Sequence, residues 1–479
     1  MYNPKSLRAD EFINHEEILD TLDFAEKNKN NLQLIDSILA KAKPKKTGKG
    51  ISCAGLDHRE ASVLLACEIP EKIQEMYDLA EEIKKALYGN RIVLFAPLYL
   101  SNYCVNNCLY CPYHMQNKTI PRVKLTQEDI AREVNALQDA GHKRLAIECG
   151  EHPQENPIEY ILESIKTIYS IKHKNGAIRR VNVNIAATTV ENYRKLKEAE
   201  IGTYILFQET YHKESYLKLH PSGPKHDYNY HTEAMDRAME GGIDDVGLGV
   251  LFGLELYKYE FAGLLMHAEH LEAVHGVGPH TISVPRIKRA DDIDPNAFDN
   301  GISDDIFAKL CALIRIAVPY TGMIISTRES QEVREKVIRL GVSQISGASR
   351  TSVGGYGEEE RPRDTEQFDV SDQRSLDEVV RWLMKMGYIP SFCTACYREG
   401  RTGDRFMSLC KTGEIQNCCH PNALLTLKEY LMDYASEETK RVGEELIKQE
   451  LGSIPREKNR LICQEYLDKI EHGQCDFRF

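Results

Sequence analysis

The sequence Tyr103-Cys104-Val105-Asn106-Asn107-Cys108-Leu109-Tyr110-Cys111 places three cysteines at spacings of four and three residues. Three thiols on a tight loop can reach three irons of one iron–sulfur cube, which leaves the fourth iron open to a reactant. A zinc site is one alternative, and it requires a fourth ligand, for which His114 is available. Cysteines that only pack in the core are a second alternative. The spacing therefore indicates a cluster whose open iron binds a small molecule.

Short apolar segments alternate with amphipathic helical segments from Arg91 onward, a pattern that predicts repeated βα units and a parallel sheet. Most of these apolar segments are continuous, as in strands buried on both faces. The eight expected strands are Ile92–Leu98, Arg144–Glu148, Val181–Ala186, Thr203–Phe207, Val246–Leu251, Thr281–Ile287, Met323–Ser326 and Val342–Ser346. An open doubly wound sheet is the alternative, but no glycine-rich phosphate motif follows the first strand. We expect an α/β fold with a closed, TIM-like (β/α)8 barrel.

Helical sequence flanks the expected barrel on both sides. Helical periodicity runs over Ala9–Lys27, and a second helix is expected between Pro70 and Gly89. The charged run Glu358–Asp364 marks the end of the barrel and precedes a mainly helical segment. The expected domains are a helical N-terminal extension at 1–90, the barrel at 91–357 and a C-terminal cluster-binding domain at 358–479.

Composition and charge exclude several classes of protein. The chain has 479 residues, of which 42% are hydrophobic, and a formal net charge of −12. The acidic balance argues against a nucleic-acid surface, and no run of about 18 apolar residues predicts a membrane span. The first residues lack the apolar core of an export signal, and the 14 cysteines fit a reducing compartment in which thiols bind metal or stay free. We expect a cytoplasmic protein that binds neither nucleic acid nor membrane.

The two cysteine gaps, with Tyr110 directly before the last cysteine, resemble the signature of the radical S-adenosylmethionine (SAM) enzymes. The resemblance implies that Cys104, Cys108 and Cys111 hold a [4Fe-4S] cluster whose open iron chelates the amino and carboxylate groups of SAM. It further implies that one electron from the cluster cleaves SAM to a 5'-deoxyadenosyl radical. We assign Tyr110 to the cofactor site. Catalytic groups in such barrels follow the carboxyl ends of the strands, where this loop is expected.

Three further positions match SAM-binding elements of the same family. Cys149-Gly150-Glu151 resembles the Gly-Gly-Glu element that holds the amino group of SAM, with Cys149 in place of the first glycine. By the same resemblance, Glu209 holds the ribose hydroxyls, since a carboxylate accepts two hydrogen bonds. Arg237 would grip the SAM carboxylate with its planar fork. The alternatives are a solvated loop glutamate at Glu151 and a surface salt bridge at Arg237.

The seventh expected strand ends in Ser326-Thr327-Arg328-Glu329, at the mouth where chemistry is expected. A fixed cation there suits the carboxylate of an amino-acid substrate. We assign that contact to Arg328 and place Ser326 beside it in the catalytic set. The alternative is that the adjacent Glu329 neutralises Arg328.

A second group of cysteines lies in the C-terminal segment. Cys393 and Cys396 are three residues apart, and Cys419 follows just before His420. These three thiols can hold a second cube with an open iron. A zinc site with His420 as fourth ligand and a redox Cys-x-x-Cys pair are alternatives. A zinc module in the tail would leave the barrel as a SAM enzyme of another specificity, and a non-enzymatic cluster carrier is a further class.

His280 directly precedes the sixth expected strand and therefore belongs to the amino-terminal mouth of the barrel. Catalytic chemistry is not expected at that end, and a lone histidine is more often a structural residue than a ligand. The second cysteine group makes it a candidate, because that group needs a place away from the first cluster.

Together, the first cysteine group, the barrel, the Arg328 segment and the second cysteine group resemble the HydG family of [FeFe]-hydrogenase maturases, which are radical SAM tyrosine lyases. The resemblance runs from the first strand to beyond Cys419. It implies cleavage of L-tyrosine to p-cresol and dehydroglycine, then conversion of dehydroglycine to carbon monoxide and cyanide on iron for H-cluster assembly. The alternative is a ThiH-like tyrosine lyase, which lacks the second cysteine group and supplies dehydroglycine for the thiazole of thiamine.

The cofactors and partners follow from the same resemblance. It implies SAM and two [4Fe-4S] clusters, the auxiliary one at Cys393, Cys396 and Cys419 carrying an extra iron through free cysteine in a [5Fe-4S] form, with His280 helping to hold that iron. L-tyrosine, L-cysteine and Fe²⁺ are the implied substrates, flavodoxin or ferredoxin the electron donor, and the hydrogenase maturation proteins HydE and HydF the partners. The two barrel mouths lie roughly 20 Å apart, so dehydroglycine requires a tunnel that excludes bulk water.

Overall fold

The computed structural model describes residues 1–48, 50–357, 365–454 and 456–479. Its centre is a barrel of eight parallel strands in the order β12-β11-β10-β9-β8-β7-β4-β3, and pairing of β12 with β3 closes the ring. The strands are β3 (Arg91–Ser101), β4 (Arg144–Cys149), β7 (Arg180–Asn184), β8 (Tyr204–Ile205), β9 (Val246–Gly249), β10 (Thr281–Ser283), β11 (Gly322–Ile325) and β12 (Gln344–Ser346). All eight expected strands are present. The closed barrel is confirmed, and the open sheet is wrong.

Several strands end earlier than the sequence predicts. The expected strand Thr281–Ile287 contains only the three residues of β10, because Pro285 cannot donate a hydrogen bond to the ladder. The expected strand Thr203–Phe207 pairs only over β8, and the chain then turns at Glu209, which has a φ of 68°. Early strand ends leave more of the chain in loops at the carboxyl mouth, where the first site is built.

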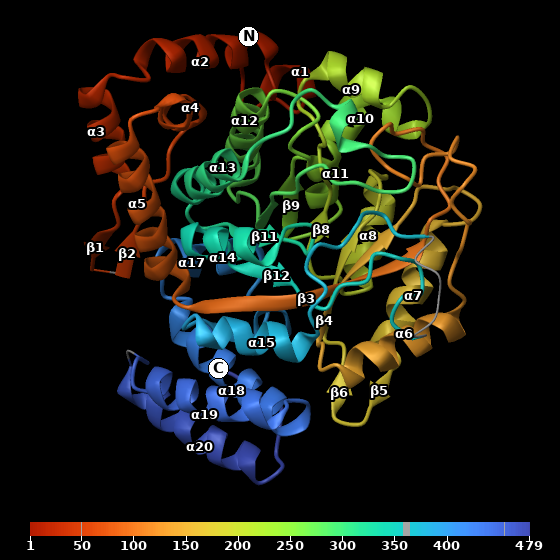
Figure 1. The fold of residues 1–479 in the computed structure, drawn as a ribbon, viewed down its shortest axis with the longest axis vertical. Coiled ribbons are helices and arrows are strands. Elements are labelled where there is room, and N and C mark those ends of the chain that lie inside the picture. Colours follow the sequence, from red (N-terminus) through yellow and green to blue (C-terminus); the bar gives the residue numbers. More distant parts are fainter. Residues whose placement is uncertain (49, 358–364, 455) are drawn as a thin grey trace.

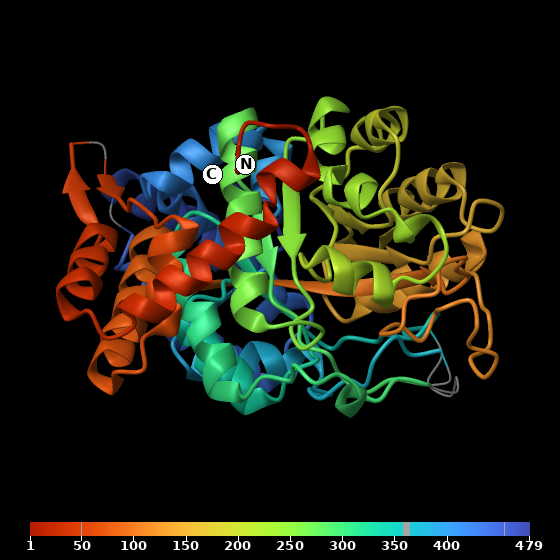
Figure 2. The same ribbon diagram turned by 90° about the horizontal axis from the view of Figure 1, so that it is seen from above.

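Helices cover the outside of the barrel and connect its strands in the expected βα order (Figures 1 and 2). They are α6 (Gln127–Asp139), α7 (Ile158–Ser170), α8 (Val190–Glu198), α9 (Lys213–Leu219), α10 (Tyr228–Thr232), α11 (Ala234–Glu240), α12 (Tyr257–His275), α13 (Asp304–Ala317) and α14 (Gln331–Leu340). The helix α12 is buried along most of its length, since the N-terminal extension packs on its outer side. Within the described ranges, no helix is long and apolar enough to cross a membrane.

The N-terminal extension packs against one side of the barrel (Figure 1). It contains α1 (Ala9–Phe12), α2 (His15–Asn28), α3 (Leu32–Ala42), α4 (His58–Ala66), α5 (Pro70–Tyr88) and a hairpin of β1 (Lys45–Thr47) with β2 (Gly50–Ser52). The expected helix Ala9–Lys27 is two helices, because Asn14 caps α2 by accepting a hydrogen bond from Glu17 N (3.0 Å). The second expected helix is confirmed as α5, which ends before Gly89 at a φ of 63°.

The C-terminal segment is mainly helical, as expected, but it also adds a ninth strand to the barrel sheet. The strand β13 (Ile389–Ser391) pairs in parallel with the start of β3, at Arg91. Its three residues include Pro390, which is tolerated because β13 lies at the sheet edge. The helices are α15 (Leu376–Lys385), α16 (Ala395–Arg398), α17 (Gly403–Lys411), α18 (Gln416–Asp433), α19 (Glu437–Leu451) and α20 (Glu457–Glu471). The expected boundary Glu358–Asp364 lies outside the described residues.

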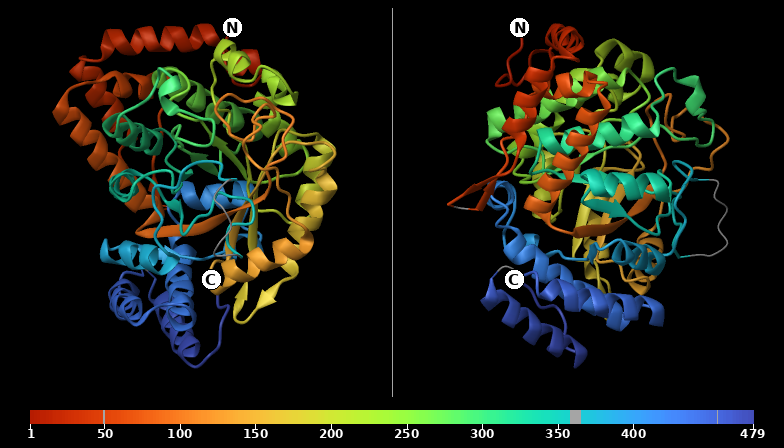
Figure 3. Two further views of the ribbon diagram at one scale, coloured as in Figure 1. Left: turned by 45° about the vertical axis from the view of Figure 1, so that its right-hand side comes forward. Right: turned by 60° about the vertical axis from the view of Figure 1, so that its left-hand side comes forward.

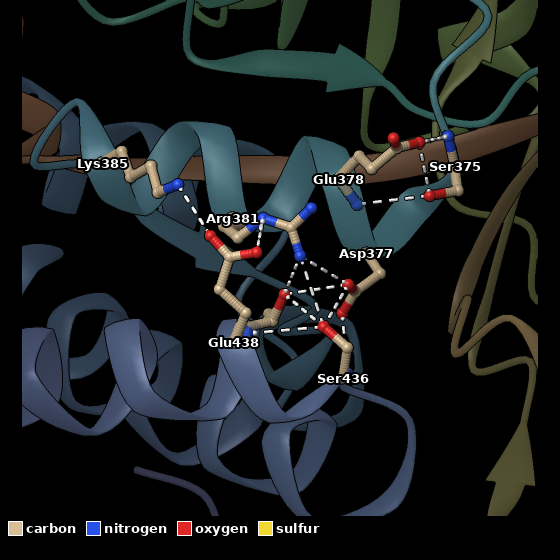
Figure 4. A network of polar contacts seen from close by, with 8 residues as sticks. Ser375, Asp377, Glu378, Arg381, Lys385, Ser436 and Glu438 are labelled. Carbon is tan, nitrogen blue, oxygen red and sulfur yellow. Dashed lines mark hydrogen bonds and ion pairs between the residues drawn. The ribbon is translucent and has the colours of Figure 1, made fainter.

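The last three helices pack together at one end of the molecule (Figure 3). A polar network joins α19 to α15 beside the barrel (Figure 4). Asp377 accepts hydrogen bonds from Ser436 N (3.1 Å) and Thr439 Oγ1 (2.9 Å). Arg381 also donates to Thr439 Oγ1 (3.0 Å). These bonds fix the start of α19 and hold the C-terminal helices in place.

Candidate active site

A cavity of about 250 Å³ opens at the carboxyl ends of the barrel strands. Loops that follow β3, β4, β8 and β11 line it, where the barrel fold predicts chemistry. Nine residues of the expected site line this cavity: Cys104, Cys108, Tyr110, Cys111, Gly150, Glu151, Glu209, Ser326 and Arg328. The structure thus brings together residues that the sequence assigned separately to the first cluster, to SAM and to the substrate.

Backbone hydrogen bonds hold the cysteine loop against two other loops. Val105 N donates to Glu151 O (2.8 Å). Leu109 N donates to Leu219 O (2.9 Å). Burial raises the pKa of Cys111 to about 12. A buried thiol gains from a metal that displaces its proton and balances the thiolate charge, so this loop fits an iron–sulfur cluster.

Tyr110 supports the loop through a buried histidine. Its hydroxyl donates to His220 Nε2 (2.7 Å), and His220 Nδ1 donates to Tyr216 O (2.7 Å). The carbonyl partner requires the proton on Nδ1, and burial lowers the pKa of His220 to about 3. The imidazole is therefore neutral, and Tyr110 contributes position rather than charge.

Glu151 and Gly150 lie against the cysteine loop. Asn106 Nδ2 donates to Glu151 Oε2 (2.6 Å), and burial raises the pKa of Glu151. A Cβ atom at Gly150 would lie 2.3 Å from Tyr103 O, so only glycine fits there. A carboxylate oriented in this way beside the thiols suits an ammonium group. The close packing of Gly150 against Tyr103 O fits the expected Gly-Gly-Glu element, in which Cys149 stands in place of the first glycine.

Glu209 forms an ion pair inside the same cavity. Lys225 Nζ donates to Glu209 Oε1 (2.8 Å), and Lys225 N donates to Asn106 Oδ1 (2.9 Å). The lysine charge also favours the thiolate forms of Cys108 and Cys111. Sequence analysis missed Lys225, because it lies in the short 3-10 turn Pro224–His226 and belongs to no motif.

A buried carboxylate holds the turn at Glu209. The φ of 68° at this residue is unfavourable for a side chain other than glycine. Glu260, fully buried on α12, accepts hydrogen bonds from Thr210 Oγ1 and from Tyr211 N (2.8 Å). Burial raises the pKa of Glu260 to about 8. Glu260 thus fixes the loop that aims Glu209 at the cavity.

Arg237 does not line this cavity. It lies on α11, where its Nε donates to Thr188 O (3.1 Å) and its guanidinium stacks on the ring of Tyr230 at 3.8 Å. The helix covers the outer face of the barrel, so these neighbours satisfy the side chain away from the mouth. Lys225 is the cation that stands beside Glu209 and the cysteine loop.

Arg328 faces the cavity after β11, with Ser326 beside it. Its guanidinium stacks on Phe368 at 3.6 Å, and burial lowers the pKa of Arg328, which marks a poorly solvated charge. Glu329, the alternative partner, instead accepts a hydrogen bond from Arg286 Nε (3.0 Å). The alternative pairing is not formed, and the Arg328 charge is available to a ligand.

Glu148 and Asn184 are cavity residues that sequence analysis missed. Asn184 Nδ2 donates to Glu148 Oε1 (2.6 Å), and burial raises the pKa of Glu148 to about 8. The carboxyl group therefore keeps its proton at neutral pH. The position of Glu148 in the sequence could have identified it as a cavity residue. It is the last residue of the expected strand Arg144–Glu148, and polar residues at the carboxyl ends of barrel strands indicate function.

A second cavity, of about 50 Å³, lies at the amino ends of the same strands. Cys393, Cys396 and Cys419 line it together with His280. The structure thus brings the second cysteine group to the mouth that His280 was expected to face. His280 Nδ1 lies 3.2 Å from Asp245 Oδ1, outside hydrogen-bond geometry.

The thiols of this second group differ in acidity. A hydrogen bond from Cys419 lowers the pKa of Cys396 to about 5, with help from Arg401 and Arg91, whereas burial raises the pKa of Cys393. A thiolate in such surroundings is a good metal ligand. Nowhere in the described ranges do three His, Cys, Asp or Glu side chains converge on a single metal ion. In a cube each thiolate binds its own iron, so these thiols fit a cluster without converging.

The histidines that a zinc site would use lie outside both cavities. His114 Nε2 contacts Asp292 Oδ2 at 3.3 Å. His420 Nε2 contacts Glu450 O at 3.1 Å. Neither lines the cavity of its neighbouring cysteines, so the expected fourth zinc ligands are not in position.

An apolar layer lies between the two cavities. It consists of Phe95, Ala146, Ile205 and Ile324, which form a cluster of their own and line the inner end of the first cavity. Residues two apart on a strand point to the same side. Arg144 accordingly lines the second cavity, two residues before Ala146 in the layer. The expected tunnel must cross this layer.

Two known families match the sequence. Residues 98–264 match the radical SAM superfamily, and residues 283–389 match the Biotin and Thiamin Synthesis associated domain. The chain is also 28% identical over 344 residues to the 2-iminoacetate synthase of Salmonella typhimurium, a match that covers 71% of this chain and 88% of that protein.

Two solved structures are similar over nearly the whole chain. A crystal structure of HydG, a maturase of the [FeFe]-hydrogenase, has a TM-score of 0.91 and 54% identity, covering 98% of this chain and 100% of that chain. HydG from Carboxydothermus hydrogenoformans has a TM-score of 0.82 and 38% identity, and the match covers 96% of this chain and 99% of that chain. With this similarity and the radical SAM match, the chain belongs to the HydG family of [FeFe]-hydrogenase maturases, which are radical SAM enzymes.

Proposed function

We propose that the protein cleaves L-tyrosine to p-cresol and dehydroglycine in the first cavity and converts dehydroglycine to carbon monoxide and cyanide on iron in the second. The observation that carries the proposal is a pair of cysteine-lined cavities at opposite ends of one barrel. Radical SAM chemistry needs only the first cysteine group, so a second group around a separate cavity supports a second reaction. The products would serve H-cluster assembly.

The first cavity has groups for the whole cofactor. Its three cysteines would hold a [4Fe-4S] cluster, which together with SAM supplies a 5'-deoxyadenosyl radical after one-electron reduction by a flavodoxin or ferredoxin. Glu151 offers a carboxylate to the SAM ammonium group. Glu209 and Lys225 offer a carboxylate and a cation to the ribose and the carboxylate of SAM.

The same cavity offers complementary groups to tyrosine. Arg328 would hold the substrate carboxylate, with Ser326 as a neighbouring hydroxyl. Glu148 and Asn184 would meet the phenol group, because a carboxyl group that keeps its proton can both donate and accept a hydrogen bond. The substrate would thus be held at both ends.

The second cavity suits a small reactive intermediate. Cys393, Cys396 and Cys419 would hold the auxiliary cluster, and His280 would help to hold an extra iron supplied with L-cysteine. Most residues that line this cavity are buried, which limits the access of water and therefore hydrolysis. Dehydroglycine would reach it by crossing the apolar layer. HydE and HydF would act with this protein in the same maturation.

Anaerobic turnover of the reduced, cluster-loaded protein with SAM and tyrosine tests the proposal. We expect p-cresol and 5'-deoxyadenosine in solution, and infrared bands of carbon monoxide and cyanide bound to iron. Metal analysis should find about eight irons per chain in two clusters, and no zinc. Absence of both p-cresol and 5'-deoxyadenosine would refute the tyrosine lyase.

A 2-iminoacetate synthase is the second candidate, and the similarity to the Salmonella enzyme favours it. A ThiH-like enzyme would release p-cresol and the same two-carbon product but would form no iron-bound carbon monoxide. The infrared spectrum after turnover therefore separates the two candidates.

A further inference from the structure

The three cysteines of the second group come from two separate elements. Cys393 and Cys396 lie in the segment 393–402, which contains α16, and Cys419 lies in the first turns of α18. The helix α16 has four residues and no side-chain cap, and so short a helix is not stable by itself. Contacts with the rest of the molecule must therefore hold Cys396 at the right distance from Cys419.

The inner side of the segment 393–402 is fixed to the barrel. The hydroxyl group of Tyr397 donates to Asp245 Oδ2 (2.5 Å), and Arg144 Nη2 donates to Cys393 O (2.7 Å). These two bonds orient the segment at the amino ends of the barrel strands. Neither bond reaches α18, so the distance from this segment to the third cysteine depends on other contacts.

Four residues that follow α20, Asp476 to Phe479, contact the outer side of the same segment, and we call them the strap. Here the chain returns from α20 to α18 (Figure 1). The ring centroids of Phe477 and Tyr466 of α20 are 4.5 Å apart, and Phe479 lies 5.9 Å from the same tyrosine. All four strap residues are described, and none of them lines either cavity. The strap therefore acts only through the elements that it contacts.

Asp476 joins the barrel, α16 and α18. Both of its carboxylate oxygens accept hydrogen bonds from Arg398 of α16, the one from Nη2 being 2.7 Å long, and Arg179 Nη1, directly before β7, lies 2.8 Å away. Its backbone N donates to Glu429 Oε1 of α18 (2.6 Å). The φ of Asp476 is 69°, which is uncommon for residues other than glycine. These contacts thus select the conformation that reaches all three elements.

Phe479 makes a second connection between the same elements. Its N donates to Asn422 Oδ1 of α18 (2.8 Å), and its O accepts a hydrogen bond from Arg401 Nη2 (2.6 Å). Arg401 N in turn donates to Cys396 O (2.7 Å). Asn422 follows Cys419 by about one helical turn in α18. The strap therefore bridges the two elements close to Cys396 on one side and close to Cys419 on the other.

The polar contacts of the strap are partly exposed. The side chains of Asp476 and Arg398 keep 33% and 30% of their accessible surface. Ion pairs of this kind contribute little to the stability of a whole domain. Regions that depend on a few such bonds open locally while the rest of the protein stays folded. Loss of the strap should therefore loosen the segment 393–402 and leave the barrel intact.

We propose that Asp476 is a positioning residue for the second cysteine group, and that the strap sets the separation of Cys396 and Cys419. The strap acts through Arg398 and Arg401, which it holds against α18. That these cysteines bind a second iron–sulfur cluster rests on the proposed function, whereas the connection between α16 and α18 does not.

Transfer of iron from the cluster-loaded protein to the chelator bathophenanthroline disulfonate tests the proposal. Wild type should hold about eight irons per chain. In Asp476→Ala, half of them should leave roughly 10-fold faster, the low end of the ratio for lost hydrogen bonds to a charged group. The other half, in the first cavity, should leave at the wild-type rate. Asp476→Glu keeps the carboxylate and should lie closer to wild type.

The matched control is Asp468→Ala. It removes a carboxylate from α20 that accepts a hydrogen bond from Gln464 of the same helix (2.9 Å), so iron should leave this variant as it leaves wild type. An equal acceleration in Asp468→Ala and Asp476→Ala would overturn the proposal, because the effect would then not depend on the contact with Arg398.

Hydrogen exchange in the cluster-loaded protein measures the connection directly. Asp476→Ala and deletion of residues 476–479 should both speed the exchange of the segment 393–402 and leave that of β3 unchanged. Release of p-cresol from tyrosine should stay at the wild-type rate, since no strap residue lines the first cavity. Loss of p-cresol, or faster release of all irons, would show that the strap serves the whole fold and would overturn the proposal.

The two measurements separate this proposal from the proposed function. If exchange of the segment 393–402 rises but wild type holds only about four irons, the connection stands and the second cluster is refuted. If wild type holds about eight irons and Asp476→Ala releases them at the wild-type rate, the positioning role of Asp476 is refuted and the second cluster stands.

Discussion

The two cavities of this barrel obtain their cysteines in opposite ways. The first takes Cys104, Cys108 and Cys111 from one loop after β3, so the spacing in the sequence already predicts a shared cluster. The second takes Cys393 and Cys396 from the segment after β13 and Cys419 from α18. These meet only because β13 pairs with β3 and α18 packs on β13.

The charges around the two cavities differ as well. In the first cavity, Glu209 is paired with Lys225, and Arg328 stands near carboxylates that retain partners of their own. In the second, Arg91 and Arg144 are buried beside the cysteines, and their Nε atoms have no hydrogen-bond partner. Balanced charges suit zwitterionic amino acids, including the amino-acid part of SAM, whereas buried guanidinium groups suit an anionic cluster. The two ends are therefore built for different chemistry.

Replacing both Cys393 and Cys396 with serine tests whether the two cavities work independently, and we expect the largest effect from this variant. The variant should lose all iron-bound carbon monoxide and about four irons per chain, because the second cluster loses two of its three ligands. It should still release p-cresol, since the first cavity shares none of these residues. Infrared spectroscopy, iron analysis and chromatography of p-cresol measure the three quantities.

The matched control for this experiment is Cys418→Ser. Cys418 is half-buried beside Cys419 but does not line the second cavity, so this variant should keep both products. If the double serine variant also loses p-cresol, the C-terminal segment serves the stability of the barrel, and the independence of the two ends is refuted.

A pair of variants sharpens the description of the first cavity. Lys225→Met should weaken SAM binding to the cluster-loaded protein roughly 10–100-fold, because a charged hydrogen-bond donor is lost beside Glu209. Arg237→Met should leave the affinity for SAM unchanged, since its guanidinium is bound to Thr188 O and Tyr230 on the outer helix. Calorimetric titration with SAM gives both values. A larger loss of SAM affinity in Arg237→Met than in Lys225→Met would instead support the assignment of Arg237 to the SAM carboxylate.

Arg328→Met tests the substrate end of the same cavity. We expect the KM for tyrosine to rise roughly 10-fold or more at nearly unchanged SAM affinity, because the substrate carboxylate loses its bidentate partner. Arg328→Lys, which keeps the charge without the fork, should give an intermediate KM. Equal KM values for wild type and Arg328→Met would remove this residue from the substrate site.

Glu148→Gln tests the protonated carboxyl group of the first cavity through the pH dependence of stability. Folding raises the pKa of Glu148 from its ordinary value of 4.5 to about 8. Between these values the folded state binds more protons than the unfolded state, so the free energy of unfolding falls as pH rises. Glutamine removes that fall, which is at most about 5 kcal/mol over the window. Denaturation midpoints of both proteins across this range, in the cluster-loaded form, measure the difference, and parallel pH curves would contradict the protonated carboxyl group.

Sequence alone predicted the parts that depend on local pattern. Continuous apolar segments located all eight barrel strands, and Pro70 at the start and Gly89 after the end located α5. It missed β13, whose three residues include a proline, and it joined α1 and α2 across the Asn14 cap. Short or capped elements depend on a partner strand or on a single hydrogen bond, which periodicity does not report.

The sequence by itself determined the cysteine loop, since three thiols so close along the chain must lie close in space. It also determined the mouth that each strand end faces, because parallel strands in a barrel share one direction. Only the tertiary structure decided that Lys225 rather than Arg237 stands beside Glu209, and that Arg91 and Arg144 meet the distant Cys419. Barrel closure and the docking of β13 and α18 set those distances, and no spacing along the chain encodes them.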